Sequence, residues 1–311
     1  MSKQLTGVLF PGQGSQEANM GRDLAESDST AMELWKMAER ACGHPLREIF
    51  WDQGCGEMDA TRYVQPALTA VNLALWMRLE SKLGAAYSAG HSLGEYCALC
   101  AAQVLEPRAV LELTSLRGRL MDEADPHSRG GMAAILKLQK DQVEDLVAQV
   151  ARDLDKVILV ANYNTPTQTV VSGDKEALQH LESLVQEAKG RLFHLPVSGA
   201  FHSPMMQEAA EELSDVMRKL DWKKPAFPIF FNSTAAMEQD PEKIKRIMST
   251  QMTSPVYFAQ LIENMHEQGV KHFVELGPKG VLSRMIPQIL GRDAGIEARN
   301  LSSLNDIELE N

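Results

Sequence analysis

The sequence predicts an α/β fold in which a small unit is inserted into a large domain. One observation is a serine between two glycines, at Gly90–Gly94, where a short strand runs into a helix. That arrangement builds a nucleophile elbow in a large α/β domain. A second is the element order β-α-β-β-α-β between residues 130 and 197, which is typical of a ferredoxin-like unit. We therefore predict a large α/β-hydrolase-like domain over residues 1–129 and 198–311, and a ferredoxin-like subdomain over residues 130–197.

The first third of the chain alternates strands and helices. Leu5–Phe10 is an apolar run typical of a buried strand, and the glycine-rich segment Pro11–Gln16 must turn after it. Helical patterns fill most of the stretch to Lys82 and include Pro66–Leu83. We then expect a strand at Ala85–Ala89 and a helix at Leu93–Val104, so the elbow has the strand-turn-helix context that it requires.

The next predicted helix, Pro107–Glu123, places an arginine on its inward side. Proline is suited to the first helical position, because its missing N–H would be unpaired there anyway. At the helical period the inward stripe holds Val110, Thr114, Arg117 and Met121, with Arg119 on the opposite side. An inward arginine needs an anionic partner, which could be an internal Asp or Glu or a bound ligand.

The inserted unit and the segments after it give a further series of elements. The small unit is predicted from strands at 132–138, 157–162, 168–172 and 191–197 and helices at 141–151 and 174–188. After it we expect helices at 204–220, 241–251, 256–268 and 279–290 and strands at 228–232 and 271–275. The polar tail from about Asp293 is expected to be loosely held.

Composition and charge exclude several classes of protein. The chain has 311 residues, 44% hydrophobic and 23% charged, which rules against disorder. A formal net charge of −11 with dispersed basic residues argues against nucleic acid as a partner. A Pro-Gly pair follows Phe10 before any signal-length apolar run, and no uncharged stretch is long enough to span a bilayer, so we expect no membrane association and a cytoplasmic location.

Cysteine and glycine patterns give no sign of a metal or cofactor. Cys97 and Cys100 lie on an apolar helix without a second ligand pair nearby, and are interpreted as reduced core thiols rather than as a metal or redox site. The Pro11–Gln16 loop lacks the third glycine of a dinucleotide-binding fingerprint and the Gly-Lys-Ser/Thr of a phosphate loop. We expect neither a cofactor nor a metal.

Ser92 needs a base, and His202 is the strongest of the eight histidines. The elbow pushes the Ser92 hydroxyl into a cleft and turns the N–H of Leu93 toward the same space, where an oxyanion could be stabilised. His202 lies where the chain leaves the small unit, with Ser203 as a possible N-cap and Pro204 opening a helix. A residue at such a junction can face a cleft between domains. The other histidines are interpreted as solvated or as strand residues, and His91 as a support of the turn.

Five segments occur together in the order found in malonyl-CoA:acyl carrier protein transacylases. They are Pro11–Gln16, Gly90–Tyr96, Leu116–Gly118, Ala200–Ser203 and Glu275–Pro278. The chain resembles this family over nearly its whole length, up to about residue 290, and the inserted unit is in the expected place.

The resemblance implies a role for each matching residue. Ser92 would take the malonyl group from coenzyme A, and His202 would accept the proton of the serine. The third member would be the backbone carbonyl of Gln251, which holds the imidazole tautomer. The backbone amides of Gln13 and Leu93 would form the oxyanion hole.

Three further residues are assigned by the resemblance to substrate binding. Arg117 would grip the free carboxylate of the malonyl group, and Phe201 would crowd a branching methyl, which favours malonyl over methylmalonyl. His91 borders the same pocket. The chain departs from the family at Ser254–Phe258, where Asn-Pro-Val is usual, and some members carry Ser in place of Phe201.

The predicted function is transfer of malonyl from malonyl-CoA to a holo acyl carrier protein in fatty acid biosynthesis, through an acyl-serine and without a cofactor. The alternatives are a trans-acting acyltransferase of a polyketide pathway and a serine hydrolase or thioesterase. A scaffold role would leave the elbow unexplained. We expect a monomer, and an acidic carrier would need a local basic patch, for which the candidates are Lys189, Arg191, Lys279 and Arg284.

Overall fold

The computed structural model describes residues 5–52 and 57–308 and contains two sheets. The larger has six strands in the order β10-β9-β1-β2-β7-β8. All neighbours in it are parallel except β8, which pairs antiparallel with β7. In that order the strands are Glu297–Leu301, Val270–Leu276, Leu5–Phe10, Ala85–Gly90, Ile229–Phe230 and Met237–Glu238.

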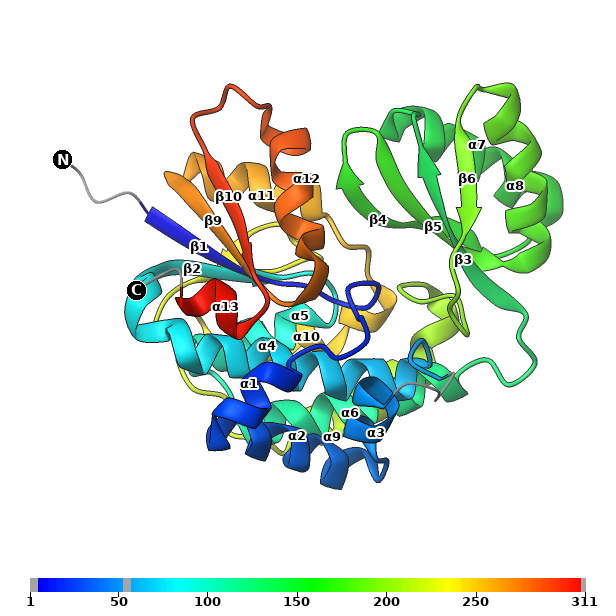
Figure 1. Ribbon diagram of the computed structural model, residues 1–311. Coiled ribbons are helices and arrows are strands. Elements are labelled where there is room, and N and C mark those ends of the chain that lie inside the picture. The colour runs from blue at the N-terminus through cyan, green and yellow to red at the C-terminus, as the bar shows by residue number, and fades with distance from the viewer. Residues whose placement is uncertain (1–4, 53–56, 309–311) are drawn as a thin grey trace.

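Helices cover both faces of the large sheet, as a mostly parallel sheet requires. Side chains alternate along β1, so Val8 and Phe10 belong to one core cluster and Leu9 to another. The first face is covered by α1 (Arg22–Ser27), α2 (Ser29–Cys42), α3 (Leu46–Trp51), α4 (Thr61–Leu83), α5 (Gly94–Ala101) and α6 (Pro107–Glu123), with α9 (Gln207–Met217) and α10 (Pro241–Ser249) in the same cluster. The second face is covered by α11 (Phe258–Glu267) and α12 (Val281–Leu290) (Figure 1).

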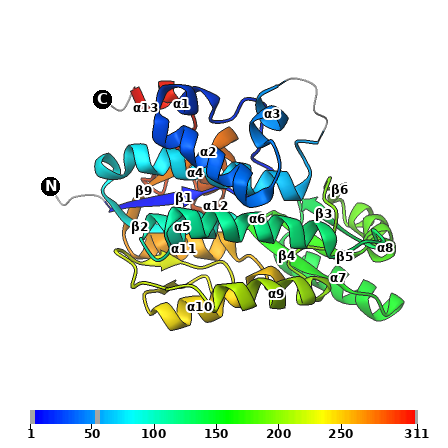
Figure 2. The same cartoon turned by 90° about the horizontal axis from the view of Figure 1, so that it is seen from below.

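The inserted segment forms a second, smaller body beside the large sheet, with a core of its own (Figures 1 and 2). Its elements are β3 (Gly130–Leu136), α7 (Lys140–Leu154), β4 (Ile158–Thr165), β5 (Gln168–Asp174), α8 (Lys175–Glu187) and β6 (Arg191–His194). The strands run in the order β4-β5-β3-β6 and every pair is antiparallel. The element order β-α-β-β-α-β is therefore the one that the sequence predicts.

Most element bounds agree with the prediction within a few residues, and α6 agrees at both ends. Helix α4 begins at Thr61, so that Pro66 lies inside it rather than at its start. The predicted helix at 204–220 is a 3-10 turn, Pro204–Met206, followed by α9, which ends at Met217. The helical patterns predicted before Lys82 include residues 53–56, which lie outside the described part of the chain.

The prediction of a loosely held tail is wrong. Residues Glu297–Leu301 form β10, which pairs in parallel with β9, and α13 (Leu304–Glu308) follows. Leu301 and Ile307 are buried in the main core. An edge strand needs only backbone pairing and a few inward side chains, so a polar segment can form one without an apolar pattern.

Three loops meet at the carboxyl edge of the large sheet. Phe10 pairs with Gly90, and Ala89 pairs with Phe230, so β1, β2 and β7 end side by side. The loop Pro11–Gln16, the elbow and the segment from Phe231 onward therefore start from one edge, which is where ligands bind in open parallel sheets. No helix within the described residues is long and apolar enough to cross a membrane.

Candidate active site

The elbow is a tight turn whose two glycines are required by close backbone contacts. Ser92 has a φ of 50°, in the left-handed region. A Cβ on Gly90 would lie 1.9 Å from the carbonyl carbon of Gly94, and a Cβ on Gly94 would lie 1.9 Å from the carbonyl oxygen of Phe10. Only glycine fits either position, and the turn that results presents Ser92 at the end of β2.

Asn232 holds the elbow from the neighbouring strand end. Its side-chain oxygen accepts the N–H of Ser92 at 2.7 Å, and its side-chain nitrogen donates to the carbonyl of Gly90 at 2.6 Å. The side chain therefore replaces the backbone pairing that the turn interrupts. Asn232 was not predicted as part of the site, and its place as the polar last residue of the predicted strand 228–232 is the signal that could have found it.

Ser92 and His202 are brought together as predicted. The Ser92 Oγ lies 2.8 Å from the Nε2 of His202, although 110 positions separate the two residues in sequence. Ser203 caps the following 3-10 turn by accepting the N–H of Met205 at 3.2 Å, and Pro204 is its first residue. His202 itself has a φ of 57°, so the chain reverses at this residue and turns the imidazole toward the elbow.

Two backbone carbonyls orient the His202 ring. Its Nδ1 lies 3.2 Å from the carbonyl oxygen of Gln251 and 3.0 Å from that of Ser254. A carbonyl can only accept, so Nδ1 carries the proton and Nε2 is left to accept the hydroxyl proton of Ser92. The carbonyl of Gln251 is where the resemblance placed it, whereas that of Ser254 is an additional partner.

Burial keeps the imidazole of His202 neutral. Its burial, and next the charge of Arg117, lower the pKa of His202 to about 3, against the opposing effect of the two carbonyl hydrogen bonds. The ring is thus a free base throughout the neutral range, which a group that must take a proton from Ser92 requires.

The loop Pro11–Gln16 lies against the elbow and completes a candidate oxyanion hole. A Cβ on Gly12 would lie 2.4 Å from the carbonyl oxygen of His91 and 3.5 Å from the backbone nitrogen of Leu93. The side chain of Gln13 donates to the Thr61 hydroxyl at 3.0 Å, which anchors the loop to α4. In the described ranges 5–52 and 57–308, no acceptor takes the backbone N–H of Gln13 or Leu93.

Arg117 faces the nucleophile, while Arg119 points outward. Arg117 is 1% exposed, and its guanidinium donates to Ser92 Oγ at 3.0 Å, to Gln251 Oε1 at 3.0 Å and to Gln65 Oε1 at 2.8 Å. Among the described residues no carboxylate forms a direct ion pair with Arg117, so the directly paired Asp or Glu considered from the sequence is not present. The buried guanidinium can therefore pair directly with an anionic ligand.

The side chains of Gln251 and Glu95 were not predicted as part of the site. Gln251 Nε2 donates to the carbonyl of Ser92 at 2.7 Å and to a carboxylate oxygen of Glu95 at 2.8 Å. The other oxygen of Glu95 accepts the N–H of Asn232 at 2.7 Å. Gln251 thus contacts Ser92, Arg117 and His202 together. Glu95 lies in the first turn of the helix after the elbow, and this position is a signal from which its role could have been suspected.

A cleft lies over these groups, between the large sheet and the small body. Its lining is Gln13, His91, Ser92, Leu93, Arg117, Met121, Met132, Asn162, Leu195, Val197, Phe201 and His202. Phe201 is 4% exposed. The ring of His91 packs on Phe258 with centroids 5.3 Å apart, and its Nε2 lies 2.8 Å from Asn164 Oδ1 on β4. His91 therefore both borders the cleft and ties the elbow to the small body.

Within residues 5–52 and 57–308, neither the cysteines nor any acidic cluster forms a metal site. Cys97 and Cys100 are buried and form no disulfide, and burial raises the pKa of both thiols, that of Cys100 to about 12. In the part of the chain that the structure describes, no group of three His, Cys, Asp or Glu side chains could hold a metal ion. The interpretation of both cysteines as inert core thiols agrees with this burial.

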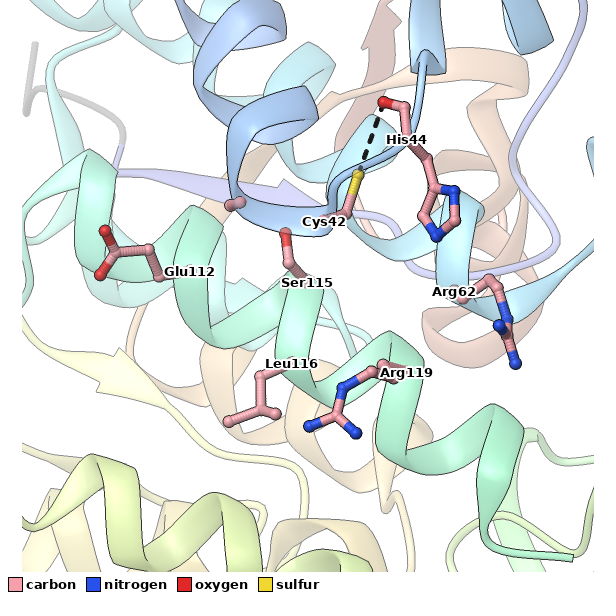
Figure 3. Close-up of a pocket in the computed structure, with 8 residues that line it drawn as sticks. Cys42, His44, Arg62, Glu112, Ser115, Leu116 and Arg119 are labelled. Atoms are coloured by element: carbon pink, nitrogen blue, oxygen red, sulfur yellow. Dashed lines mark hydrogen bonds between the residues drawn. The ribbon is translucent and has the colours of Figure 1, made fainter.

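A second cavity, shown in Figure 3, lies between α2, α4 and α6 and shares no residue with the cleft. It contains two arginines, and both already have acidic partners. Arg62 pairs with Asp122, and Arg119 pairs with Glu123 and Glu212. The charge of these two arginines is compensated by direct ion pairs, whereas Arg117 forms none among the described residues.

The four basic residues suggested for carrier docking are all exposed. Arg191 is the first residue of β6, and Lys189 lies two residues before it. Lys279 lies in the 3-10 turn Pro278–Gly280, and Arg284 lies in the first turn of α12 that follows. Arg284 donates to the carbonyl of Lys279. They form two pairs on different bodies of the molecule.

A serine on a tight strand-to-helix turn, a neutral histidine and a cleft between two bodies are features that an acyl-transferring enzyme requires. The chain belongs to the acyl transferase domain family, whose model matches residues 8–304. It is 37% identical over 312 residues to the malonyl CoA-acyl carrier protein transacylase of Staphylococcus aureus (strain MW2), covering 99% of this chain and 98% of that one. The predicted family resemblance is therefore confirmed.

Solved structures show the same similarity. The malonyl-CoA:acyl carrier protein transacylase of Xanthomonas oryzae pv. oryzae has a TM-score of 0.91 and 33% identity, covering 99% of this chain and 98% of that one. A malonyl-transacylase in complex with a holo type II polyketide synthase acyl-carrier protein also has a TM-score of 0.91, at 31% identity and 98% coverage of each chain. The mixed α/β fold predicted from the sequence is confirmed.

Proposed function

We propose that this protein moves a malonyl group from coenzyme A to the phosphopantetheine thiol of an acyl carrier protein, in fatty acid biosynthesis. One observation carries the proposal. Arg117, buried and without a carboxylate partner among the described residues, donates to the same Ser92 oxygen that lies 2.8 Å from His202. Nucleophile, base and anion-binding group thus converge on one atom, and the names of the relatives support this substrate.

The first half-reaction loads Ser92. His202 Nε2 takes the proton as Ser92 Oγ forms a bond to the thioester carbonyl carbon. The backbone N–H groups of Leu93 and Gln13 stabilise the oxyanion. The carbon-sulfur bond then breaks, the coenzyme A thiolate takes the proton from His202, and a malonyl ester remains on the serine.

The second half-reaction reverses these steps with a different thiol. The phosphopantetheine thiol of the carrier gives its proton to His202 and attacks the ester. As the carbon-oxygen bond breaks, Ser92 recovers the proton. Throughout, the Arg117 guanidinium holds the malonyl carboxylate by two charge-assisted hydrogen bonds, which an acetyl group lacks.

The test is mass spectrometry of the intact protein after brief exposure to malonyl-CoA. We expect one malonyl adduct per chain, which persists until a holo carrier protein is added and then moves to it. Ser92→Ala should show no adduct. A wild-type adduct that is lost at once to water, without any carrier, would favour a hydrolase instead.

The choice of carrier is decided by a second measurement. One structural neighbour contains a polyketide synthase carrier, so a trans-acting role in a polyketide pathway is the alternative. Transfer rates to a fatty-acid carrier and to a type II polyketide carrier, measured side by side, separate the two. We expect the fatty-acid carrier to be preferred.

Docking on the acidic carrier is proposed to use Lys189 and Arg191 on one body and Lys279 and Arg284 on the other, which are all exposed. Charge reversal at these positions should raise the KM for the carrier and leave that for malonyl-CoA unchanged. An unchanged KM for the carrier with a raised KM for malonyl-CoA would exclude these four residues as the docking site.

The fold classes of the two domains, with their boundaries, are part of the same proposal. The large domain, residues 1–129 and 198–311, is classed as α/β-hydrolase-like with an elbow, and residues 130–197 as a ferredoxin-like subdomain; the strand order β4-β5-β3-β6 supports the second. A monomeric state and a cytoplasmic location stay predictions, and size-exclusion chromatography at several concentrations tests the first.

A further inference from the structure

Arg117 and Glu95 form a buried charge pair that a neutral side chain keeps apart. Gln251 Nε2 donates to Glu95 Oε2 at 2.8 Å, and Gln251 Oε1 accepts from Arg117 Nη2 at 3.0 Å. Glu95 is 0% exposed and Arg117 is 1% exposed. The carboxylate is thus linked to the guanidinium through one amide group, close enough to interact electrostatically but without direct contact.

This separation leaves Arg117 available to a second anion. Direct pairing with an internal carboxylate would occupy the donors of the guanidinium and exclude a substrate carboxylate. Through the amide, Glu95 compensates the charge of Arg117 while the end of the guanidinium faces Ser92 and the cleft. A buried arginine without any counter-charge would be costly.

We propose that Glu95 is a positioning residue that serves as the resting counter-ion of Arg117 through Gln251, and takes up one proton when a malonyl carboxylate binds the guanidinium. The proposal rests on the malonyl-binding role of Arg117 in the proposed function. The proton comes from solvent and converts the Glu95 carboxylate to the neutral acid, without any change in covalent bonds elsewhere.

The net charge of the buried site explains why protonation of Glu95 accompanies binding of the malonyl carboxylate. Above pH 7 and without substrate, the buried site holds one positive charge on Arg117 and one negative charge on Glu95. A malonyl carboxylate adds a second negative charge in a region of low polarity, where an uncompensated charge is strongly disfavoured. Protonation of Glu95 returns the site to neutrality, and the substrate carboxylate takes over as partner of the guanidinium.

The environment of Glu95 makes this protonation accessible near neutral pH. Burial raises the pKa of Glu95 to about 7, against the opposing effects of the Asn232 N–H, the Gln251 amide and the charge of Arg117. When the substrate carboxylate neutralises Arg117, that last effect is weakened, so the pKa of Glu95 rises further. Binding and protonation therefore favour each other.

The other ionisable groups around Glu95 do not titrate in the same range. The pKa of His202 is lowered to about 3, chiefly by burial, and burial also lowers the pKa of His91. Burial raises the pKa of Tyr96, whose ring lies 5.6 Å from the guanidinium, to about 12. Among the described residues around Arg117, Glu95 is left as the group whose charge changes near neutral pH.

The experiment measures proton uptake on binding. Ser92→Ala protein, which binds thioesters without reacting, is titrated calorimetrically with malonyl-CoA and with acetyl-CoA at pH 8, in buffers of different ionisation enthalpy. We expect about half a proton or more to be taken up with malonyl-CoA beyond the value for acetyl-CoA. Above pH 7 the Kd for malonyl-CoA should rise about tenfold per pH unit until Glu95 is ionised in the complex too.

Substitution of Glu95 tests whether this residue is the group that takes up the proton. Adding Glu95→Gln should abolish the extra uptake and the pH dependence of malonyl-CoA binding. Glu275→Gln is the matched control, because Glu275 is another buried carboxylate at a strand end whose pKa is raised by burial. The Glu275→Gln protein should retain both the extra proton uptake and the pH dependence of malonyl-CoA binding. Extra uptake that survives Glu95→Gln, or equal uptake with the two thioesters, would overturn the proposal.

A double variant guards against a structural effect of Glu95→Gln alone. Glu95→Gln with Gln251→Glu keeps a donor opposite an acceptor between these two side chains and moves the carboxylate directly against Arg117. It also removes the bond from Gln251 Nε2 to the Ser92 carbonyl, a loss that affects both thioesters, so the readout is the ratio of their affinities. We expect the ratio of malonyl-CoA to acetyl-CoA affinity to fall about tenfold or more. An unchanged ratio would contradict the counter-ion role.

Failure of this proposal is distinguishable from failure of the proposed function. If Arg117→Ala removes the preference for malonyl-CoA but no proton accompanies binding in Ser92→Ala protein, only the role of Glu95 is wrong. If Arg117→Ala leaves the affinities for both thioesters unchanged, the role of Arg117 is wrong, and this proposal fails with it.

Discussion

The two walls of the cleft differ in the polarity of their side chains. The wall at the edge of the large sheet carries Ser92, Gln13 and Arg117, all held by hydrogen bonds to neighbouring side chains. The wall from the small body is mainly apolar, with Met132, Leu195 and Val197. In the proposed mechanism, the reacting groups are therefore fixed at the ends of parallel strands and on helix α6, while the small body contributes apolar side chains that shape the cleft.

His202 lies at the boundary between the two walls, and its loss should have the largest effect. Among the described residues that contact Ser92 Oγ, His202 is the one that can accept its proton, so kcat of His202→Ala should fall on the order of 10⁴-fold. Single-turnover formation of the acyl-enzyme is the measurement. The control is His194→Ala, because His194 is half exposed on β6. Comparable losses in the two variants would contradict the comparison of the walls.

Arg117→Ala should produce the next largest effect and a selective one. Loss of the charge-assisted contact should cost about 2 to 4 kcal/mol in malonyl transfer, or roughly 30- to 1,000-fold in kcat/KM. Acetyl transfer should be retained or increased. Arg119→Ala, two residues further on the same helix and half exposed, should change neither. Equal loss of malonyl and acetyl transfer would exclude substrate selection by Arg117.

The rigidity of the catalytic wall is tested by a pair of glycines. In Gly94→Ala the new Cβ would meet the backbone of Phe10, and the free energy of unfolding should fall by about 3 kcal/mol. In Gly131→Ala, on β3 of the small body, the nearest atom is a Leu178 side chain at 3.4 Å, and the change should stay within about 0.5 kcal/mol. Denaturant unfolding measures the free energy of unfolding of both variants. Similar losses in the two would contradict the idea that the elbow is more tightly constrained than β3.

The smallest expected effect concerns the shape of the cleft. Phe201→Ser should raise methylmalonyl relative to malonyl transfer by about tenfold, because space for one methyl group is worth little more than this. Steady-state comparison of the two thioesters is the measurement, with Phe193→Ser as control, since Phe193 is 50% exposed on β6. An unchanged ratio would assign Phe201 to packing alone.

The local elements of this protein could be read from the sequence. Helix α6 was predicted at both ends, because Pro107 marks its start and the apolar period continues to its last turn. The strand-turn-helix around Ser92 was also predictable, since glycine spacing reports a backbone requirement. Periodicity failed for the tail, because an edge strand such as β10 is held by backbone pairing that leaves no apolar pattern.

The sequence by itself determined the elbow, the inward face of Arg117 and the small inserted unit, since each depends on the local order of residues. Only the tertiary structure decided which groups partner them. Sheet order placed Asn232 beside Ser92, and the packing of η2 (Gln251–Thr253) placed Gln251 between Glu95 and Arg117. Those contacts join residues up to 156 positions apart. Side-chain geometry across such distances is set by the packing of whole elements, which no local pattern encodes.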